Sequence, residues 1–373
     1  MSASIPLFKV HMPSGAAPAL AATLASGQLA LGAKVEAFER GLADYTGNPR
    51  VNAMSDVSGA LTLALYIAGV RPGDEVVVSP MVCLATSMPI ANLFARPVWC
   101  DVDPATGMLD PARIAGLVTP RTRAILAYHW SGDVADIEAL QTAARGFGLP
   151  LIEDASEAFG AEYRGRKLGD HGSEFCIYSF AAVRQITTGE GAALFCASEQ
   201  THGQARQLRR YGIHQAGFRL PSGDLNPESD IAVPGFNFCM NNIAASIGLT
   251  QLPEAAGIVE RQRDNGRYYD SALADIAGIT PLARRADAVS GYWTYSLRAE
   301  RRADLMRKLQ QDGIGCQRLH VRNDRYSCFA QQRRDDALPG VDLFDRENLS
   351  IPCGWWLTHE ERERVVACIR AGW

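Results

Sequence analysis

Several short stretches carry side chains that could bind an anion or move protons. Ser58 and Gly59 open an apolar helical pattern, and a small hydroxyl residue beside a glycine at a helix start offers backbone N–H groups to a phosphate. Taken alone, the same pattern is also explained by an ordinary serine N-cap. Glu153 and Asp154 directly follow an apolar run, and a carboxylate at the carboxyl end of a parallel strand can face a ligand crevice. A helix cap or a water-facing acid explains these two residues equally well.

The stretch from Ser179 to Gly191 is the most unusual in the chain. It passes from a strand-like run into a glycine-containing turn without the apolar periodicity of a helix, and it includes Arg184. A turn of this kind can bring hydroxyls and a cation against a phosphorylated ligand. A surface loop remains the alternative interpretation.

Two of the seven histidines are candidates for chemistry. His129 ends a predicted strand and could do acid–base work in the same crevice, although a buried, hydrogen-bonded histidine also fits there. His320 is followed by Arg322, whose guanidinium presents a fixed fork of donors suited to a substrate anion. No cluster of His, Cys, Asp and Glu has the spacing of metal ligands, so we expect no metal site.

The elements that position these residues follow from the apolar runs. Short, nearly continuous apolar runs are typical of strands buried on both faces of a parallel sheet, and the amphipathic segment 137–147 suits a crossover helix between two of them. The loop expected over 214–234 precedes a long helical pattern over 241–273, which Pro253 interrupts. We therefore expect an N-terminal segment (1–24), a large α/β domain with a mainly parallel sheet (25–250) and a small α+β domain (251–373). The runs read as strands lie at 76–78, 97–99, 124–127, 149–152 and 192–196.

Composition excludes several classes of partner. The chain has 373 residues and a formal net charge of −4, so nothing favours nucleic acid or an acidic membrane surface. No window of about 18 residues is continuously apolar, and residues 1–15 do not have the pattern of a signal peptide. The nine cysteines are scattered without CxxC spacing, which is typical of reduced thiols. We expect a cytoplasmic protein with no membrane or nucleic-acid partner.

Lysine is rare in this sequence. Only four of the 37 basic residues are lysines: Lys9, Lys34, Lys167 and Lys308. Chemistry that needs an amine nucleophile therefore has four side chains to draw on.

Taken in order, these stretches resemble the DegT/DnrJ/StrS-type sugar aminotransferases, which are pyridoxal-phosphate (PLP) proteins of fold type I. The resemblance extends from about residue 25 onward, and residues 351–358 are similar to a subset that handles lipopolysaccharide-type sugars. It implies a PLP-transferase-like large domain and a smaller C-terminal α+β domain. The segments that carry it are 71–76, 101–104, 119–122, 152–161, 179–180, 187–191 and 235–241.

The resemblance also assigns residues to a cofactor. It implies that Asp154 keeps the pyridinium nitrogen of PLP protonated, so that the ring can withdraw electrons. It implies that Asn237 reaches the phosphate across a dimer interface, and hence a homodimer with shared active sites. The full set of cofactor-binding residues that it implies is Ser58, Gly59, Cys83, Asp154, Glu157, Ser179 and Asn237.

One position departs from the family's chemistry. Arg184 aligns with the lysine that forms the Schiff base with PLP, and a guanidinium stays protonated in proteins, so it can neither form that link nor shuttle a proton. Val57, Cys239 and Ala192 also depart from the usual pattern of the pocket. We therefore expect PLP or pyridoxamine phosphate (PMP) to bind without a covalent link, or no cofactor at all.

These observations favour an enzyme of sugar or secondary-metabolite biosynthesis that is not an ordinary transaminase. Its substrate is expected to be a nucleotide-linked or amino sugar, bound near His320 and Arg322, with Arg184 and His129 as the candidate catalytic residues. In a form without cofactor, Asp154, Glu157 or His129 would do the acid–base work. Two alternatives stay open: an ordinary sugar aminotransferase with an engineered Lys-to-Arg substitution, and a non-catalytic pseudoenzyme or ligand-sensing partner of an active homologue.

Overall fold

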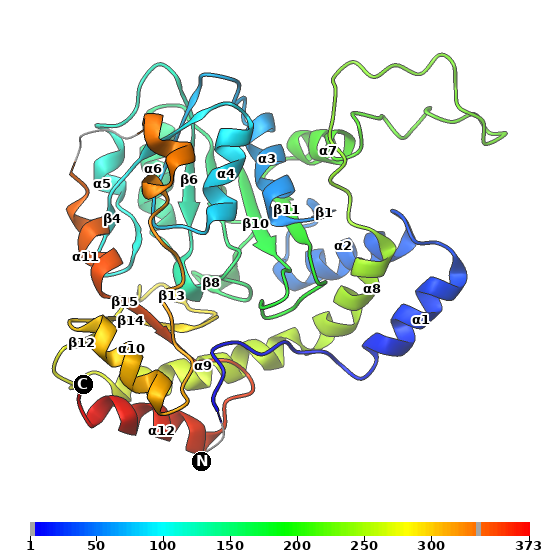
Figure 1. The fold of residues 1–373 in the computed structure, drawn as a ribbon. Helices are drawn as coiled ribbons and strands as arrows, with labels where there is room; N and C mark the ends of the chain where they lie inside the picture. Colours follow the sequence, from blue (N-terminus) through cyan, green and yellow to red (C-terminus); the bar gives the residue numbers. More distant parts are fainter. Residues whose placement is uncertain (1–3, 333–336) are drawn as a thin grey trace.

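A seven-stranded sheet forms the centre of the molecule. The computed structural model describes residues 4–332 and 337–373, and its main sheet has the strand order β1-β11-β10-β7-β6-β2-β3 (Figure 1). Strands β10, β7, β6, β2 and β3 pair in parallel, whereas β11 pairs antiparallel with both of its neighbours. The strands are β1 (Val51–Met54), β2 (Glu75–Val78), β3 (Arg96–Trp99), β6 (Thr122–Tyr128), β7 (Leu151–Asp154), β10 (Phe175–Ser179) and β11 (Ala192–Cys196).

Helices surround this sheet and lead into a smaller region. The helix α6 illustrates how they form: Asp136 caps its start by accepting from the N–H of Ala139, and Ile137, Leu140 and Ala144 make its buried stripe. The helices are α1 (Ala16–Ser26), α2 (Ala33–Thr46), α3 (Val57–Ile67), α4 (Leu84–Asn92), α5 (Pro111–Ile114), α6 (Ile137–Gly146), α7 (Glu199–Leu208), α8 (Asn242–Gln251), α9 (Ala255–Ala272), α10 (Arg302–Gln311), α11 (Pro339–Glu347) and α12 (His359–Arg370).

The smaller region is built on a second sheet with the order β12-β14-β15 (Figure 1). Its three strands are antiparallel, and α10 and α12 pack beside them around a separate hydrophobic cluster. The remaining short elements are β12 (Ile279–Pro281), β14 (Tyr295–Ala299), β15 (Asn348–Ile351), β4 (Val102–Asp103), β5 (Met108–Leu109), β8 (Glu162–Tyr163), β9 (Arg166–Lys167), β13 (Ala288–Val289) and the 3-10 turns η1 (Trp130–Gly132), η2 (Leu252–Glu254), η3 (Asn323–Arg325) and η4 (Ser327–Gln332).

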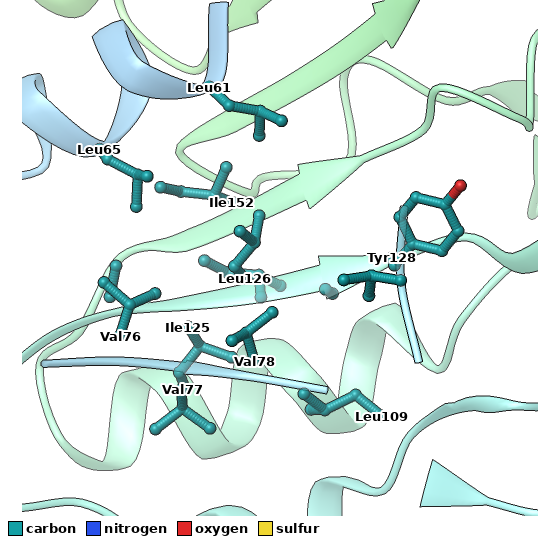
Figure 2. Close-up of a cluster of buried hydrophobic side chains, with 14 of the residues drawn as sticks. Leu61, Leu65, Val76, Val77, Val78, Leu109, Ile125, Leu126, Tyr128 and Ile152 are labelled. Atoms are coloured by element: carbon teal, nitrogen blue, oxygen red, sulfur yellow. The ribbon is translucent and has the colours of Figure 1, made fainter. Parts of the chain in front are cut away.

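The core of the large sheet is apolar on both faces. Figure 2 shows Val76 to Val78 of β2 next to Ile125 and Leu126 of β6, with Leu61 and Leu65 of α3 near Ile152. Every residue of β2 and β7 is buried, which explains the apolar run Val76 to Val78 in β2; β7 continues from its apolar residues into the two buried acids Glu153 and Asp154. Four of the five expected runs lie within strands, and the fifth, expected at 149–152, is shifted to 151–154.

Two further predictions are confirmed and one is shifted. The helical pattern over 241–273 is α8, the short turn η2 that contains Pro253, and α9, and the loop expected over 214–234 has no helix or ladder strand. The helix expected to open at Ser58 begins at Val57, with Asp56 as its cap. Among the described residues, no helix is long and apolar enough to cross a membrane.

Candidate functional site

Three neighbouring strands end at one edge of the large sheet. Tyr128, the last residue of β6, lies opposite Asp154, the last residue of β7, and β10 on the other side of β7 ends at Ser179. The carboxyl ends of parallel strands are where open α/β sheets bind ligands. The strand order therefore gathers Tyr128, Asp154 and Ser179 in one place.

Asp154 is a carboxyl group held inside the protein. It is 1% exposed, and its two oxygens accept from the Thr86 hydroxyl at 2.6 Å and from the backbone N–H of Ser156 at 3.0 Å. Burial raises the pKa of Asp154 above its ordinary range, although these hydrogen bonds oppose the shift. A buried carboxyl of this kind is suited to pair with a cationic group brought by a ligand.

Glu157 stands one turn further along and is the centre of a buried network. Its Oε1 lies 2.8 Å from His320 Nε2, and its Oε2 accepts from the backbone N–H of Ser131 at 2.7 Å. The Tyr128 hydroxyl lies 3.1 Å from the same His320 nitrogen. Burial alone raises the pKa of Glu157, but the charges and hydrogen bonds of its neighbours, chiefly His320, outweigh it and hold that pKa below its usual range.

Arg184 lies in the turn after β10, beside this network. Its Nη1 is 3.5 Å from Glu157 Oε1, and its guanidinium carbon is 4.1 Å from the ring centroid of Trp293. The Arg184 side chain is only 9% exposed. The structure thus brings Arg184, Asp154, Glu157 and His320 into one cluster, with the Arg184 cation among the groups that act on Asp154.

The loop that carries His320 is tied to the loop after β2. The side-chain amide of Asn323 donates to the Ser87 hydroxyl at 2.8 Å and to the carbonyl of Val82 at 3.2 Å. The same amide lies 3.4 Å from the carbonyl of Cys83, the half-buried N-cap residue of α4. Burial raises the pKa of the Cys83 thiol, and Glu157, Arg184 and Asp154 are close enough to act on it.

Arg322 is occupied within the protein. Its Nε and Nη2 donate to the two carboxylate oxygens of Asp324 at 2.7 and 2.6 Å, and its Nη1 donates to Asp342. The Arg322 guanidinium, which was expected to bind a substrate anion, therefore donates to Asp324 and Asp342 instead. A substrate role for Arg322 stays a prediction.

His129 lies on the opposite face of the sheet from Tyr128. Successive side chains of a strand alternate between faces, so His129 meets Glu153, not Asp154. Its Nε2 is 2.8 Å from Glu153 Oε2, its Nδ1 accepts from the N–H of Ala135, and the ring is fully buried. Burial raises the pKa of Glu153, but its interactions with His129, together with those of Ser173 and His171, outweigh burial and lower that pKa. The structure does not bring His129 to the cluster around Arg184.

The start of α3 differs in detail from the predicted phosphate cup. The N–H of Gly59 donates to Asp56 Oδ1 at 2.7 Å, so the cap itself uses that donor. A Cβ on Gly59 would lie 2.9 Å from the Phe238 ring, which explains a glycine here by packing. The Ser58 residue is half-buried beside this cap, and Ser179 is buried with its Oγ accepting from the N–H of Ala181.

Asn237 lies on a stretch that pairs with the chain just before α3, where the N–H of Ser55 donates to the carbonyl of Phe238 at 2.8 Å. It is exposed and forms an isolated bridge with Arg210. In the part of the chain that the structure describes, no group of three or more His, Cys, Asp and Glu residues could hold a metal ion.

Three residues of the cluster were missed from the sequence. Tyr128 could have been found, because it precedes His129 at a strand end and alternation puts one of the two on the ligand side. Thr86 and Trp293 gave no signal, since each reaches the site from an element distant in sequence.

Comparison with known proteins agrees with this architecture. The sugar aminotransferase CalS13 from Micromonospora echinospora is 36% identical with a TM-score of 0.93, over 99% of this chain and 100% of that one. AtS13 from Actinomadura melliaura is 37% identical with a TM-score of 0.92, over 100% of both chains. Spr1654 from Streptococcus pneumoniae, 24% identical with a TM-score of 0.89 over 99% of this chain and 97% of that one, shares the fold and has been solved in PMP and PLP forms.

The fold class and a family model both identify the family of this chain. The α/β fold is that of the type I PLP-transferases, with a mainly parallel sheet. A model of the DegT/DnrJ/EryC1/StrS aminotransferase family matches residues 14–370, nearly the whole chain. This chain therefore belongs to the DegT/DnrJ/EryC1/StrS aminotransferase family.

Proposed function

We propose that this chain is an enzyme of sugar or secondary-metabolite biosynthesis that holds PMP or PLP without a covalent bond. It acts on a nucleotide-linked or amino sugar and does not catalyse ordinary transamination. The observation that carries the proposal is the cation beside Asp154 and Glu157, which is Arg184 and not a lysine. The four lysines lie elsewhere in the chain: Lys9 against Trp355, Lys167 against Tyr45, Lys34 in α2 and Lys308 in α10.

The residues present suit such a cofactor at its ring nitrogen. Asp154 is buried, its pKa is raised, and it accepts hydrogen bonds from the neutral donors Thr86 and Ser156, so a pyridinium would supply an opposite charge. We assign the phosphate to the hydroxyls of Ser58, which is half-buried, and Ser179, which is buried, with Asn237 contributed by the second subunit of a homodimer. When bound, the cofactor supplies an electron sink for the substrate carbon next to nitrogen.

The other residues of the cluster bind and carry protons. His320 Nε2 lies within hydrogen-bond distance of both the Glu157 carboxylate and the Tyr128 hydroxyl, so an N–H at that nitrogen can donate to Glu157. Thr86 and the N–H of Ser156 fix the orientation of Asp154. Arg184 keeps its charge at all ordinary pH values, and it therefore orients acceptors and does not exchange protons.

The absorbance spectrum of the purified protein tests the proposal. The protein is incubated with PLP or with PMP, dialysed, treated with borohydride and mapped by peptide mass spectrometry. We expect cofactor to remain after dialysis and no lysine to carry a reduced pyridoxyl group. A reduced adduct on any lysine, or complete loss of cofactor, contradicts the proposal.

The Arg184→Lys variant distinguishes this proposal from the alternative that the chain is an ordinary sugar aminotransferase with a single Lys-to-Arg change. We expect this variant to gain a reducible link to PLP but no transamination of a nucleotide-linked keto sugar, because Val57, Cys239 and Ala192 have also departed from the usual pattern. Restored transamination would instead favour an ordinary sugar aminotransferase.

A further inference from the structure

Two of the three nitrogens of the buried Arg184 guanidinium have no hydrogen-bond acceptor among the described residues. These are Nε and Nη1, which are inaccessible to solvent. A buried charged donor without an acceptor costs several times the value of an ordinary hydrogen bond. The site is therefore incomplete until some group brings acceptor atoms to Arg184.

Packing holds this guanidinium in a fixed position. Trp293 lies under it at 4.1 Å, and the indole is itself fixed because its Nε1 donates to the carbonyl of Val183 at 2.7 Å. The ring of Phe8 stacks on Trp293 with centroids 4.9 Å apart and an interplanar angle of 22°. Arg184 is thus a pre-oriented fork of donors, which lowers the entropy lost when an acceptor binds.

Glu157 does not supply the missing acceptors. Both of its oxygens already have closer partners, His320 at 2.8 Å and the N–H of Ser131 at 2.7 Å, whereas its contact with Arg184 Nη1 is 3.5 Å. That contact is an ion pair without a hydrogen bond, and it leaves the Nε of Arg184 unmatched. One carboxylate is shared between an arginine and a histidine.

We infer that Arg184 binds a carboxylate carried by the substrate, so that the substrate class is a sugar acid. A planar carboxylate can accept two parallel hydrogen bonds from a guanidinium edge. A phosphate dianion is the poorer match, because the carboxylates of Asp154 and Glu157 repel a second negative charge more strongly than a first. The sugar part of this inference rests on the proposed function, whereas the carboxylate part rests on Arg184 itself.

Calorimetric titration of the full-length protein with sodium glucuronate tests this assignment. Glucose is the neutral probe of the same size, and sodium chloride at equal ionic strength is the control for general anion effects. We expect saturable binding of glucuronate with a dissociation constant in the millimolar range, and binding of glucose that is at least about tenfold weaker. Equal binding of the two sugars, or no saturable heat with glucuronate, overturns the inference.

Two variants test whether Arg184 causes the preference for glucuronate over glucose. Arg184→Gln should lose the preference for glucuronate; its side-chain amide can still lie on the Trp293 ring, and a thermal melt checks that the variant folds. Arg267→Gln removes the same charge from an exposed position on α9, where Arg267 pairs with Glu260 and Asp264, and it should keep the preference. A preference that survives in Arg184→Gln contradicts the inference.

The same titration is performed with and without bound PMP. Failure of PMP to bind, with the preference for glucuronate intact, would reject the proposed cofactor and keep the carboxylate site. Retention of PMP without any preference would reject the carboxylate site and keep the cofactor.

Discussion

The pKa values of two adjacent acids at the end of β7 are shifted in opposite directions. Glu153 faces one side of the sheet, where His129 is its partner, and its pKa is lowered. Asp154 faces the other side, where it has only neutral donors and a more distant cation, and its pKa is raised. Glu153 has its partner within the fold, whereas Asp154 can pair with a cationic group of a ligand.

Matched substitutions of these two acids should change stability in opposite directions. Because the pKa of folded Asp154 is raised, the ionised group destabilises the fold, and this penalty grows as pH rises from about 4 through the folded pKa. Asp154→Asn should therefore stabilise the cofactor-free protein by about 1 kcal/mol at pH 7.5, since Asn can accept from the N–H of Ser156 and donate to the Thr86 oxygen. The gain should disappear near pH 4.

Glu153→Gln is the control with the opposite sign. A lowered pKa stabilises the fold above about pH 4.3, and this contribution is lost as pH falls through the folded pKa. Disrupting the buried pair with His129 should cost about 3 kcal/mol at pH 7.5. Thermal melts at several pH values measure the stability changes of both variants. PMP affinity is measured in parallel, and this affinity should fall at least tenfold in Asp154→Asn and remain unchanged in Glu153→Gln. Parallel behaviour of the two variants would refute this assignment.

At the scale of single elements, the start of α3 places a carboxylate where a phosphate is proposed to bind. Asp56 Oδ1 takes the N–H of Gly59, and its Oδ2 lies 2.8 Å from the Ser55 hydroxyl. A negative side chain and a phosphate favour the same helix terminus, because both are attracted to its unpaired N–H groups. Asp56 therefore competes with the phosphate that Ser58 would hold.

Removing that charge while keeping the cap should strengthen phosphate binding. Asp56→Ser retains a side-chain oxygen for the N–H of Gly59, so the melting temperature should change little. The affinity for PMP should rise about three- to tenfold as repulsion is relieved. Asp110→Ser, which alters the cap of the distant short helix α5, is the matched control and should leave the affinity unchanged. Weaker PMP binding in Asp56→Ser would mean that the phosphate lies elsewhere.

The elements that the sequence predicts well are those whose burial is continuous. Strands such as β2 and β11 are buried along their whole length, so their apolar runs predict them directly. Asp56 was missed as a cap because Ser58 offered an equally good pattern two residues later. The stack of Trp293 under Arg184 and the hydroxyl of Thr86 on Asp154 depend on long-range packing, which local periodicity does not report.

At the scale of the whole molecule, one long segment extends away from the body. Figure 1 shows the chain between α7 and α8 projecting beyond the sheet, and this segment exposes Leu225, Ile231 and Val233 as well as Asn237. Exposed apolar side chains gathered on one segment favour contact with another surface. This supports the proposal that Asn237 completes the site of a second copy of the chain.

Complementation between two defective variants can test that exchange. Asn237→Ala and Asp154→Ala should each weaken PMP binding when every subunit carries the same change. If Asn237 acts across the interface, a heterodimer of the two variants contains one site with both defects and one intact site. Heterodimers isolated with two different affinity tags should then bind PMP tightly at about half a molecule per chain, as counted by absorbance after dialysis.

If Asn237 serves its own subunit, each site keeps one defect and tight binding does not return, which would refute the shared site. Heterodimers of Asn237→Ala with wild-type chain serve as the control, because they retain one intact site under either arrangement.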